Sequence, residues 1–154
     1  MKNLIVNGDF ATQQLAPWTT NAIHDPVFEP AKPGGYSLKL EPNTEIQQQL
    51  ETRESGDYLL DWTFSARIDA KAHLGGALFV MFSSRVGDEF YLDTSYTAQL
   101  TEQWQTFTYQ GIQPFPARHE SLYIQIINAR KVDEQGPASA PVQVTGICAS
   151  TRAA

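Results

Sequence analysis

Cysteine, clustered basic residues and long apolar runs are all scarce in this chain of 154 residues. The single cysteine, Cys148, excludes an intramolecular disulfide and is typical of a reducing compartment. The net charge is −6 and the 11 basic residues are scattered, which disfavours nucleic acid and anionic membranes as partners. No apolar run is long enough to cross a bilayer.

Targeting and catalytic motifs are absent as well. The first residues lack the apolar region and the cleavage site of a secretory signal, so we expect a cytoplasmic location or secretion by a non-classical route. The sequence holds no Gly-x-Ser-x-Gly nucleophile motif, no phosphate-binding glycine loop and no histidine spacing typical of zinc. Acidic residues such as Asp61 and Asp93 could form a glycosidase pair, but their sequence spacing does not establish one. We therefore predict a protein that is not an enzyme.

Almost every patterned stretch of the chain has a period of two residues, which is typical of β-strands with one buried face. Residues 58–68 show this alternation over the greatest length. Further strands are predicted at 36–40, 46–50, 77–85, 89–93, 106–110, 122–127 and 142–148. Turn residues such as Gly87-Asp88 and Pro114 to Pro116 separate them, and residues 98–102 could form one helical turn.

This spacing of short strands predicts an all-β fold, a two-sheet antiparallel β-sandwich with jelly-roll topology. A closed barrel would have the same pattern. The length predicts one domain over residues 1–150 with a frayed C-terminal tail at 151–154.

The order of several short motifs adds a family resemblance. The chain opens with an apolar segment that we predict to be a strand, followed by Asn7-Gly8-Asp9-Phe10 and then Trp18. Ile46-x-Gln48-x-Leu50 follows, then the long strand from residue 56 to 67, and then Trp104-x-x-Phe107-x-Tyr109. Together these motifs resemble the galactose-binding-like β-sandwiches, in particular carbohydrate-binding modules of families 4, 9 and 22.

The resemblance implies that one structural calcium ion is possible. Asp9, with backbone oxygens near Asn7 and Lys39, would supply its ligands. The chain departs from the family pattern where such modules often carry acidic residues: Ala11 follows the opening Phe10, and the last strand, 142–147, has no acidic pair. The other reading of Asp9 is a side chain that caps its own turn.

The resemblance also implies a noncatalytic module that binds an oligosaccharide or polysaccharide on the concave face of one sheet. Aromatic rings would stack on the sugar while polar groups bind its hydroxyls. Polar positions of the predicted strands supply the candidate ligand-binding residues, which are Asp61, Arg67, Tyr91, Asp93, Tyr123 and Gln125. Alternatively, Arg67 pairs with Asp61 or Asp93 and the tyrosines only cover the sheet.

A second function remains open from the sequence, namely a protein-interaction or assembly domain of the same fold, with oligomerisation possible. An exposed apolar strip that includes Leu59, Phe79 and Met81 would favour this function. Exposed tyrosines beside Arg67 and Gln125 would instead favour sugar binding.

Overall fold

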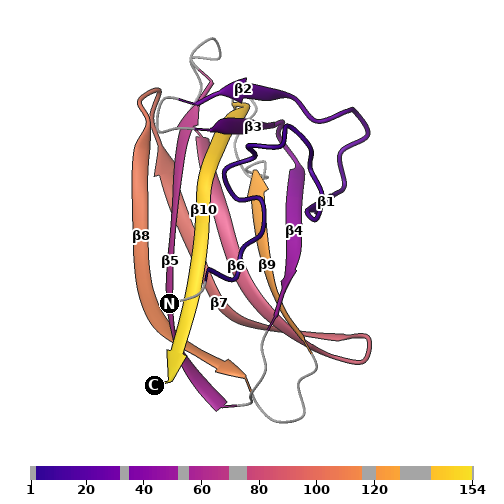
Figure 1. Ribbon diagram of the computed structural model, residues 1–154, viewed down its shortest axis with the longest axis vertical. Helices are drawn as coiled ribbons and strands as arrows, with labels where there is room; N and C mark the ends of the chain where they lie inside the picture. Colours follow the sequence, from indigo (N-terminus) through magenta and orange to yellow (C-terminus); the bar gives the residue numbers. More distant parts are fainter. Residues whose placement is uncertain are drawn as a thin grey trace, which may run out of the picture.

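Two antiparallel sheets stacked face to face form the molecule (Figure 1). The computed structural model describes residues 3–31, 35–51, 56–69, 76–115, 121–128 and 140–153. Sheet A has the strand order β1-β4-β9-β6-β7 and sheet B the order β2-β3-β10-β5-β8. The strands are β1 (Thr19–Thr20), β2 (Phe28–Pro30), β3 (Tyr36–Leu40), β4 (Thr44–Leu50), β5 (Gly56–Ile68), β6 (Gly76–Val86), β7 (Glu89–Leu100), β8 (Gln105–Phe115), β9 (Ser121–Asn128) and β10 (Val142–Ala153).

This is the predicted jelly-roll sandwich, and the two separate sheets exclude the closed barrel. Every strand predicted from alternation is present, but three boundaries were wrong. Residues 98–100 extend β7 and form no helical turn, because Ala98 pairs with Leu78 of β6. Pro114 lies within β8, and residues 151–153 continue β10 along β5 instead of fraying. No helix among the described residues could span a membrane.

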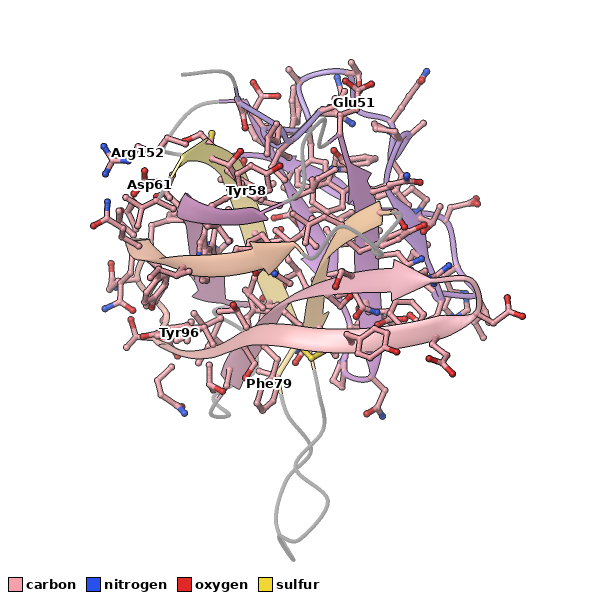
Figure 2. All side chains as sticks on the ribbon, turned by 90° about the horizontal axis from the view of Figure 1, so that it is seen from below. Glu51, Tyr58, Asp61, Phe79, Tyr96 and Arg152 are labelled. Carbon is pink, nitrogen blue, oxygen red and sulfur yellow. The ribbon has the colours of Figure 1, made fainter. Side chains whose placement is uncertain are left out.

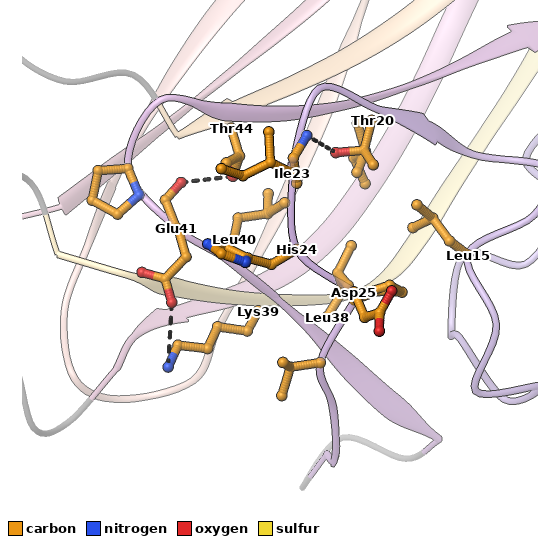
Figure 3. A pocket seen from close by; sticks show the side chains of 15 residues that line it. Leu15, Thr20, Ile23, His24, Asp25, Leu38, Lys39, Leu40, Glu41 and Thr44 are labelled. Atoms are coloured by element: carbon orange, nitrogen blue, oxygen red, sulfur yellow. Dashed lines mark hydrogen bonds and ion pairs between the residues drawn. The ribbon is translucent and has the colours of Figure 1, made fainter.

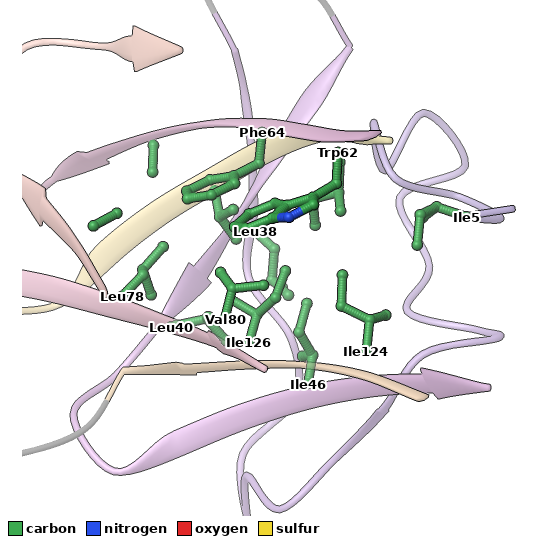
Figure 4. Close-up of a cluster of buried hydrophobic side chains, with 14 of the residues drawn as sticks. Ile5, Leu38, Leu40, Ile46, Trp62, Phe64, Leu78, Val80, Ile124 and Ile126 are labelled. Carbon is green, nitrogen blue, oxygen red and sulfur yellow. The ribbon is translucent and has the colours of Figure 1, made fainter. Parts of the chain in front are cut away.

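The core lies between the sheets and is closed by aromatic rings of β5 (Figure 4). Trp62 and Phe64 stack with their ring centroids 5.6 Å apart and face Val80, Ile124 and Ile126 of sheet A. All five side chains are at most 5% exposed. The period-two alternation of β5, β6 and β9 therefore reflects burial of one face of each strand.

The opening segment was predicted to be a strand, and this prediction was wrong. Residues 3–10 contain no strand and have bends and a turn at 6–9. Side chains supply part of the backbone hydrogen bonds of this segment, and the Leu4 amide donates to the Ala149 carbonyl at 2.7 Å. Gln48 of β4 accepts a hydrogen bond from the Val6 amide at 2.8 Å and donates one to the Val6 carbonyl at 2.9 Å. Asn3 accepts from the amides of Ile5 and Ala149.

The Asn7-to-Phe10 turn seats this segment in an irregularity of β10. The pairing of β10 with β5 shifts register between Thr145 and Cys148, and there the Ile147 amide donates to the Gly8 carbonyl at 3.0 Å. A Cβ on Gly8 would lie 1.9 Å from the Ile147 carbonyl oxygen, so only glycine fits this approach. Phe10 is fully buried, and Trp18, 3% exposed, joins the core as an anchor of the same turn.

Candidate functional site

The outer side of sheet A gathers aromatic, amide and guanidinium groups on one surface. We call it the glutamine face. Its residues point away from the core because they alternate with buried neighbours along each strand. They are Glu45, Gln47 and Gln49 of β4, Arg85 of β6, Phe90 of β7, and Tyr123 and Gln125 of β9.

An arginine lies between two rings at the hairpin end of this face. The Arg85 guanidinium carbon is 3.8 Å from the centroid of Phe90 and 4.5 Å from that of Tyr123. The two ring centroids are 6.1 Å apart. The strands dictate this contact, because Arg85 pairs with Phe90 across the β6–β7 hairpin and with Ser121 of β9 on the other side. Phe90 stays 47% exposed, so part of its ring remains available to a ligand.

Amide side chains continue the face along β4 and β9. Gln47 pairs with Gln125 across the strands, and Gln49 pairs with Tyr123. The Gln125 amide donates to Gln47 at 3.3 Å and to Glu45 at 3.4 Å, and the Tyr123 hydroxyl donates to Gln49 at 3.4 Å. These bonds are long for such groups and hold the side chains in a row that a polar ligand can compete for. The arrangement offers both donors and acceptors beside an exposed ring.

Of the predicted ligand-binding residues, Tyr123 and Gln125 lie on the glutamine face and Tyr91 does not. A bulge in β7 is the reason: Thr94 pairs with Phe82 and Leu92 with Ser83, which leaves Asp93 as the extra residue. Beyond the bulge Tyr91 pairs with Ser84, a fully buried residue, so Tyr91 points to the side of the sheet opposite Phe90. Its hydroxyl donates to Glu89 at 2.7 Å. The Asp93 side chain lies outside the described part of the chain.

Asp61 and Arg67 belong to the other layer, so the six predicted residues do not share one face. Both lie on the outer side of β5 in sheet B, separated from each other by about 20 Å of extended strand. Asp61 accepts a hydrogen bond from Gln110 at 2.7 Å and lies 3.8 Å from Arg152, beside which Figure 2 shows it. Arg67 donates to the Ile68 carbonyl and covers the Trp104 ring at 5.4 Å.

Sequence reasoning missed Arg85 and Phe90. The signal was the turn at Gly87-Asp88, whose glycine has φ +57°. A two-residue hairpin turn fixes register, and it places Val86 opposite Glu89 and therefore Arg85 opposite Phe90. The β7 bulge could not be read from the sequence, and the prediction of Tyr91 assumed an unbroken alternation along the strand.

The oxygens expected to hold calcium are engaged in hydrogen bonds within the fold. The Asp9 carboxylate accepts from the Ala11 amide at 3.1 Å, and the Asp9 carbonyl accepts from Tyr36. The Asn7 carbonyl accepts from the Trp18 indole at 3.0 Å. Across the described residues, no three His, Cys, Asp or Glu side chains converge on one point. The Asp9 carboxylate thus caps its own turn, which is the other reading that the sequence offered for this residue.

A cavity opens at the edge of the sandwich, between the loop after β1 and strands β3 and β4 (Figure 3). This cavity of about 590 Å³ is walled by Leu38, Leu40 and Ile46 of the core. Its polar groups largely bind one another, since Lys39 pairs with Glu41 at 3.5 Å and the Thr44 hydroxyl donates to the Glu41 carbonyl. Among the described residues that line the cavity there is no Phe, Tyr or Trp, whereas the glutamine face has an exposed phenyl ring.

Similar solved structures place this chain among carbohydrate-binding β-sandwiches by fold. No protein-family model matches the sequence, and no curated protein matches it. The module TmCBM61, solved in complex with β-1,4-galactotriose, has a TM-score of 0.64 at 14% identity and aligns over 99% of this chain and all of its own. The CBM22-1 xylan-binding domain of Paenibacillus barcinonensis Xyn10C has a TM-score of 0.68 at 15% identity, covering 99% of this chain and 96% of its own.

The same fold also occurs inside a larger protein. The enzymatically active domain of tailspike protein 4 from bacteriophage CBA120 has a TM-score of 0.61 at 12% identity, and the match covers 97% of this chain but 21% of that one. At these identities the likeness establishes the β-sandwich fold of carbohydrate-binding modules. The function has to be argued from the site.

Proposed function

We propose that this protein is a noncatalytic module that binds a glycan chain on the glutamine face. The observation that carries the proposal is the Phe90–Arg85–Tyr123 stack at one end of a row of amide side chains. An exposed ring binds the apolar side of a pyranose, while amide and guanidinium groups bind its hydroxyls. The fold shared with TmCBM61 and the CBM22-1 domain supports the same class of ligand.

The charge and shape of the face support a neutral polymer as the ligand. Glu45 and Arg85 are the charged groups of the face, and the remaining groups are amides, a phenol and a phenyl ring, with Met81 opposite Gln125 and Ser83 opposite Tyr123 on β6. An open sheet surface holds a chain of several sugar units along the amide row instead of enclosing one unit. Because neighbours of this fold are described as xylan-binding and as bound to β-1,4-galactotriose, xylan and β-1,4-galactan are the first ligands to test.

The decisive test compares two neighbouring aromatic residues on opposite sides of β7. Affinity electrophoresis in xylan, galactan and a panel of other polysaccharides would measure binding of the wild type, Phe90→Ala and Tyr91→Ala. We expect Phe90→Ala to weaken binding at least about tenfold, which corresponds to about 1.4 kcal/mol, and Tyr91→Ala to bind as the wild type.

Two results would contradict this proposal. A wild type that binds no glycan in the panel would remove the function. Binding that survives Phe90→Ala and Tyr123→Ala but is lost in Asp61→Ala would move the site to the outer side of sheet B.

The apolar strip that would have favoured the rival function, protein interaction, is divided between the two sheets. Leu59 lies on sheet B, whereas Phe79 and Met81 lie on sheet A. Each of the three side chains is half-buried. Figure 2 shows Phe79 in the layer opposite Asp61. The three residues therefore do not form one strip.

A further inference from the structure

The edge of sheet B formed by β8 has fewer protective features than the other three sheet edges, since it carries one proline, Pro114 near its end, but no charged residue and no bulge. Strand β1 is two residues long, and β2 is three residues long and includes Glu29 and Pro30. Strand β7 has a bulge and carries Glu89 and Asp93. Short length, charge, proline and bulges are the features by which edge strands avoid pairing with other chains.

Strand β8 has a long, uncharged edge. It covers 11 residues, Gln105–Phe115, and its sequence contains no Asp, Glu, Lys or Arg. It pairs with β5 on one side, and no described strand pairs with its other side, which runs along the margin of the molecule in Figure 1. Ile112 on this strand is 62% exposed.

The pairing with β5 shows which backbone groups face the open edge. In an antiparallel pair, residues alternate between bonding the partner strand and pointing away from it. Pro114 has no amide to donate and pairs with Asp57, so it belongs to the positions that point away. The Phe107 carbonyl lies on the β5 side, because it accepts from the Thr63 hydroxyl at 2.9 Å. The residues whose backbone N–H and C=O groups face the open edge are therefore Thr106, Thr108, Gln110 and Ile112. We call these four the outward residues of β8.

We propose that two copies of this chain associate by antiparallel pairing of their β8 edges, which joins the two B sheets into one continuous sheet. In such a two-fold pair each strand meets itself, so any charged residue near its centre would face a like charge. The absence of charge from β8 removes that repulsion, and an unpaired backbone edge gains hydrogen bonds from an identical edge.

In one register, the backbone amide and carbonyl groups of all four outward residues form hydrogen bonds with the second copy. With the two-fold axis at Tyr109, Thr106 lies opposite Ile112 of the second copy and Thr108 lies opposite Gln110. Every outward residue then donates one amide hydrogen bond and accepts one. In this register Thr106 of the other copy partly covers the Ile112 side chain.

Sedimentation equilibrium tests this proposal at protein concentrations up to about 0.5 mM, with reductant present because Cys148 is exposed. We expect the wild type to approach twice the mass of one chain, 17.2 kDa, and Thr108→Lys to sediment as a single chain. Thr106→Lys should weaken the dimer less than Thr108→Lys does, because position 106 faces Ile112 of the second copy and lies far from its own symmetry mate. Gln103→Lys introduces the same charge in the exposed turn before β8 and should leave the dimer intact.

Amide exchange measured by NMR distinguishes this interface from any other. In the wild type, the amides of Thr106, Thr108, Gln110 and Ile112 should exchange slowly, and in Thr108→Lys they should exchange at least about tenfold faster. The alternate amides of Phe107 and Tyr109 should stay protected in both proteins, because β5 bonds them. A monomeric wild type, a dimer that survives both lysine variants, or loss of the dimer in Gln103→Lys would each overturn the proposal.

Discussion

Single residues hold the opening segment against the sandwich, where a strand had been predicted. Asn7 donates from its side-chain amide to the Gln14 and Ala16 carbonyls at 2.7 and 3.1 Å and so fixes the loop that leads to Trp18. Asn7 and Phe10 both have positive φ, 57° and 51°, a conformation that asparagine tolerates better than phenylalanine. Full burial of the Phe10 ring offsets this backbone strain.

Gly8→Ala should destabilise the protein by at least about 2 kcal/mol, because the added methyl group would meet the Ile147 carbonyl and force the turn off β10. Urea unfolding followed by tryptophan fluorescence measures the change in the free energy of unfolding. Gly111→Ala is the matched control: a Cβ there has no atom within 4 Å, and the substitution should be nearly neutral. Equal effects of the two substitutions would show that the close approach to Ile147 does not matter.

Among the elements, β7 and β8 meet through a pair of tyrosine side chains. Tyr96 of β7 and Tyr109 of β8 lie where the edges of the two sheets approach each other, with ring centroids 3.6 Å apart. The Trp62 ring lies 4.4 Å from Tyr109 and extends the cluster into the core. Burial, together with the hydrogen bond to Tyr96, raises the pKa of Tyr109 far above its usual value.

This raised pKa predicts that the protein loses stability at high pH. Tyr109 ionises near pH 10 in the unfolded chain but stays protonated in the folded one, so its contribution is complete below about pH 10 and declines as the pH rises further. Urea unfolding at about pH 8 and pH 11 measures the effect. Tyr109→Phe should show a smaller loss between these two pH values than the wild type. An identical loss in both proteins would assign the pH dependence to other groups.

The alternation of β4, β5, β6 and β9 was enough to predict these strands and their buried faces, because burial of alternate side chains is a property of the local sequence. Other features depended on partners distant in the sequence. Gln48 was recognised as part of a motif, but its role is to bond both backbone groups of Val6, 42 residues away. The β7 bulge depends on how β6 pairs with it, and it decided that Phe90, and not Tyr91, lies on the glutamine face.

For the whole molecule, the stacking of two sheets separates surfaces that the sequence suggested were one. Asp61 and Arg67 point outward from sheet B, and Tyr123 and Gln125 point outward from sheet A. Between them lies the hydrophobic core, which is continuous from Ile5 to Ala149. The stability of this sandwich rests on that core, since the described part of the chain holds neither a disulfide nor a cluster of metal-binding side chains.

Removal of divalent metal should therefore leave the melting temperature unchanged. A bound ion stabilises the native state and raises the melting temperature, but the oxygens of Asp9 and Asn7 already accept hydrogen bonds. Thermal unfolding with and without a chelator, followed by addition of excess calcium, measures the difference. A decrease of several degrees on chelation, reversed by calcium, would show that other residues hold an ion.

By itself, the sequence determined the class of the fold, because the alternation along each strand indicates which side chains are buried. It also determined the turn at Gly87-Asp88 and the absence of charge from β8, both of which are local properties. Only the tertiary structure decided which strands share a sheet, which outward residues share a surface and which strand edge stays unpaired. Those outcomes depend on contacts between segments far apart in the chain, and a single bulge or a change of sheet reverses them.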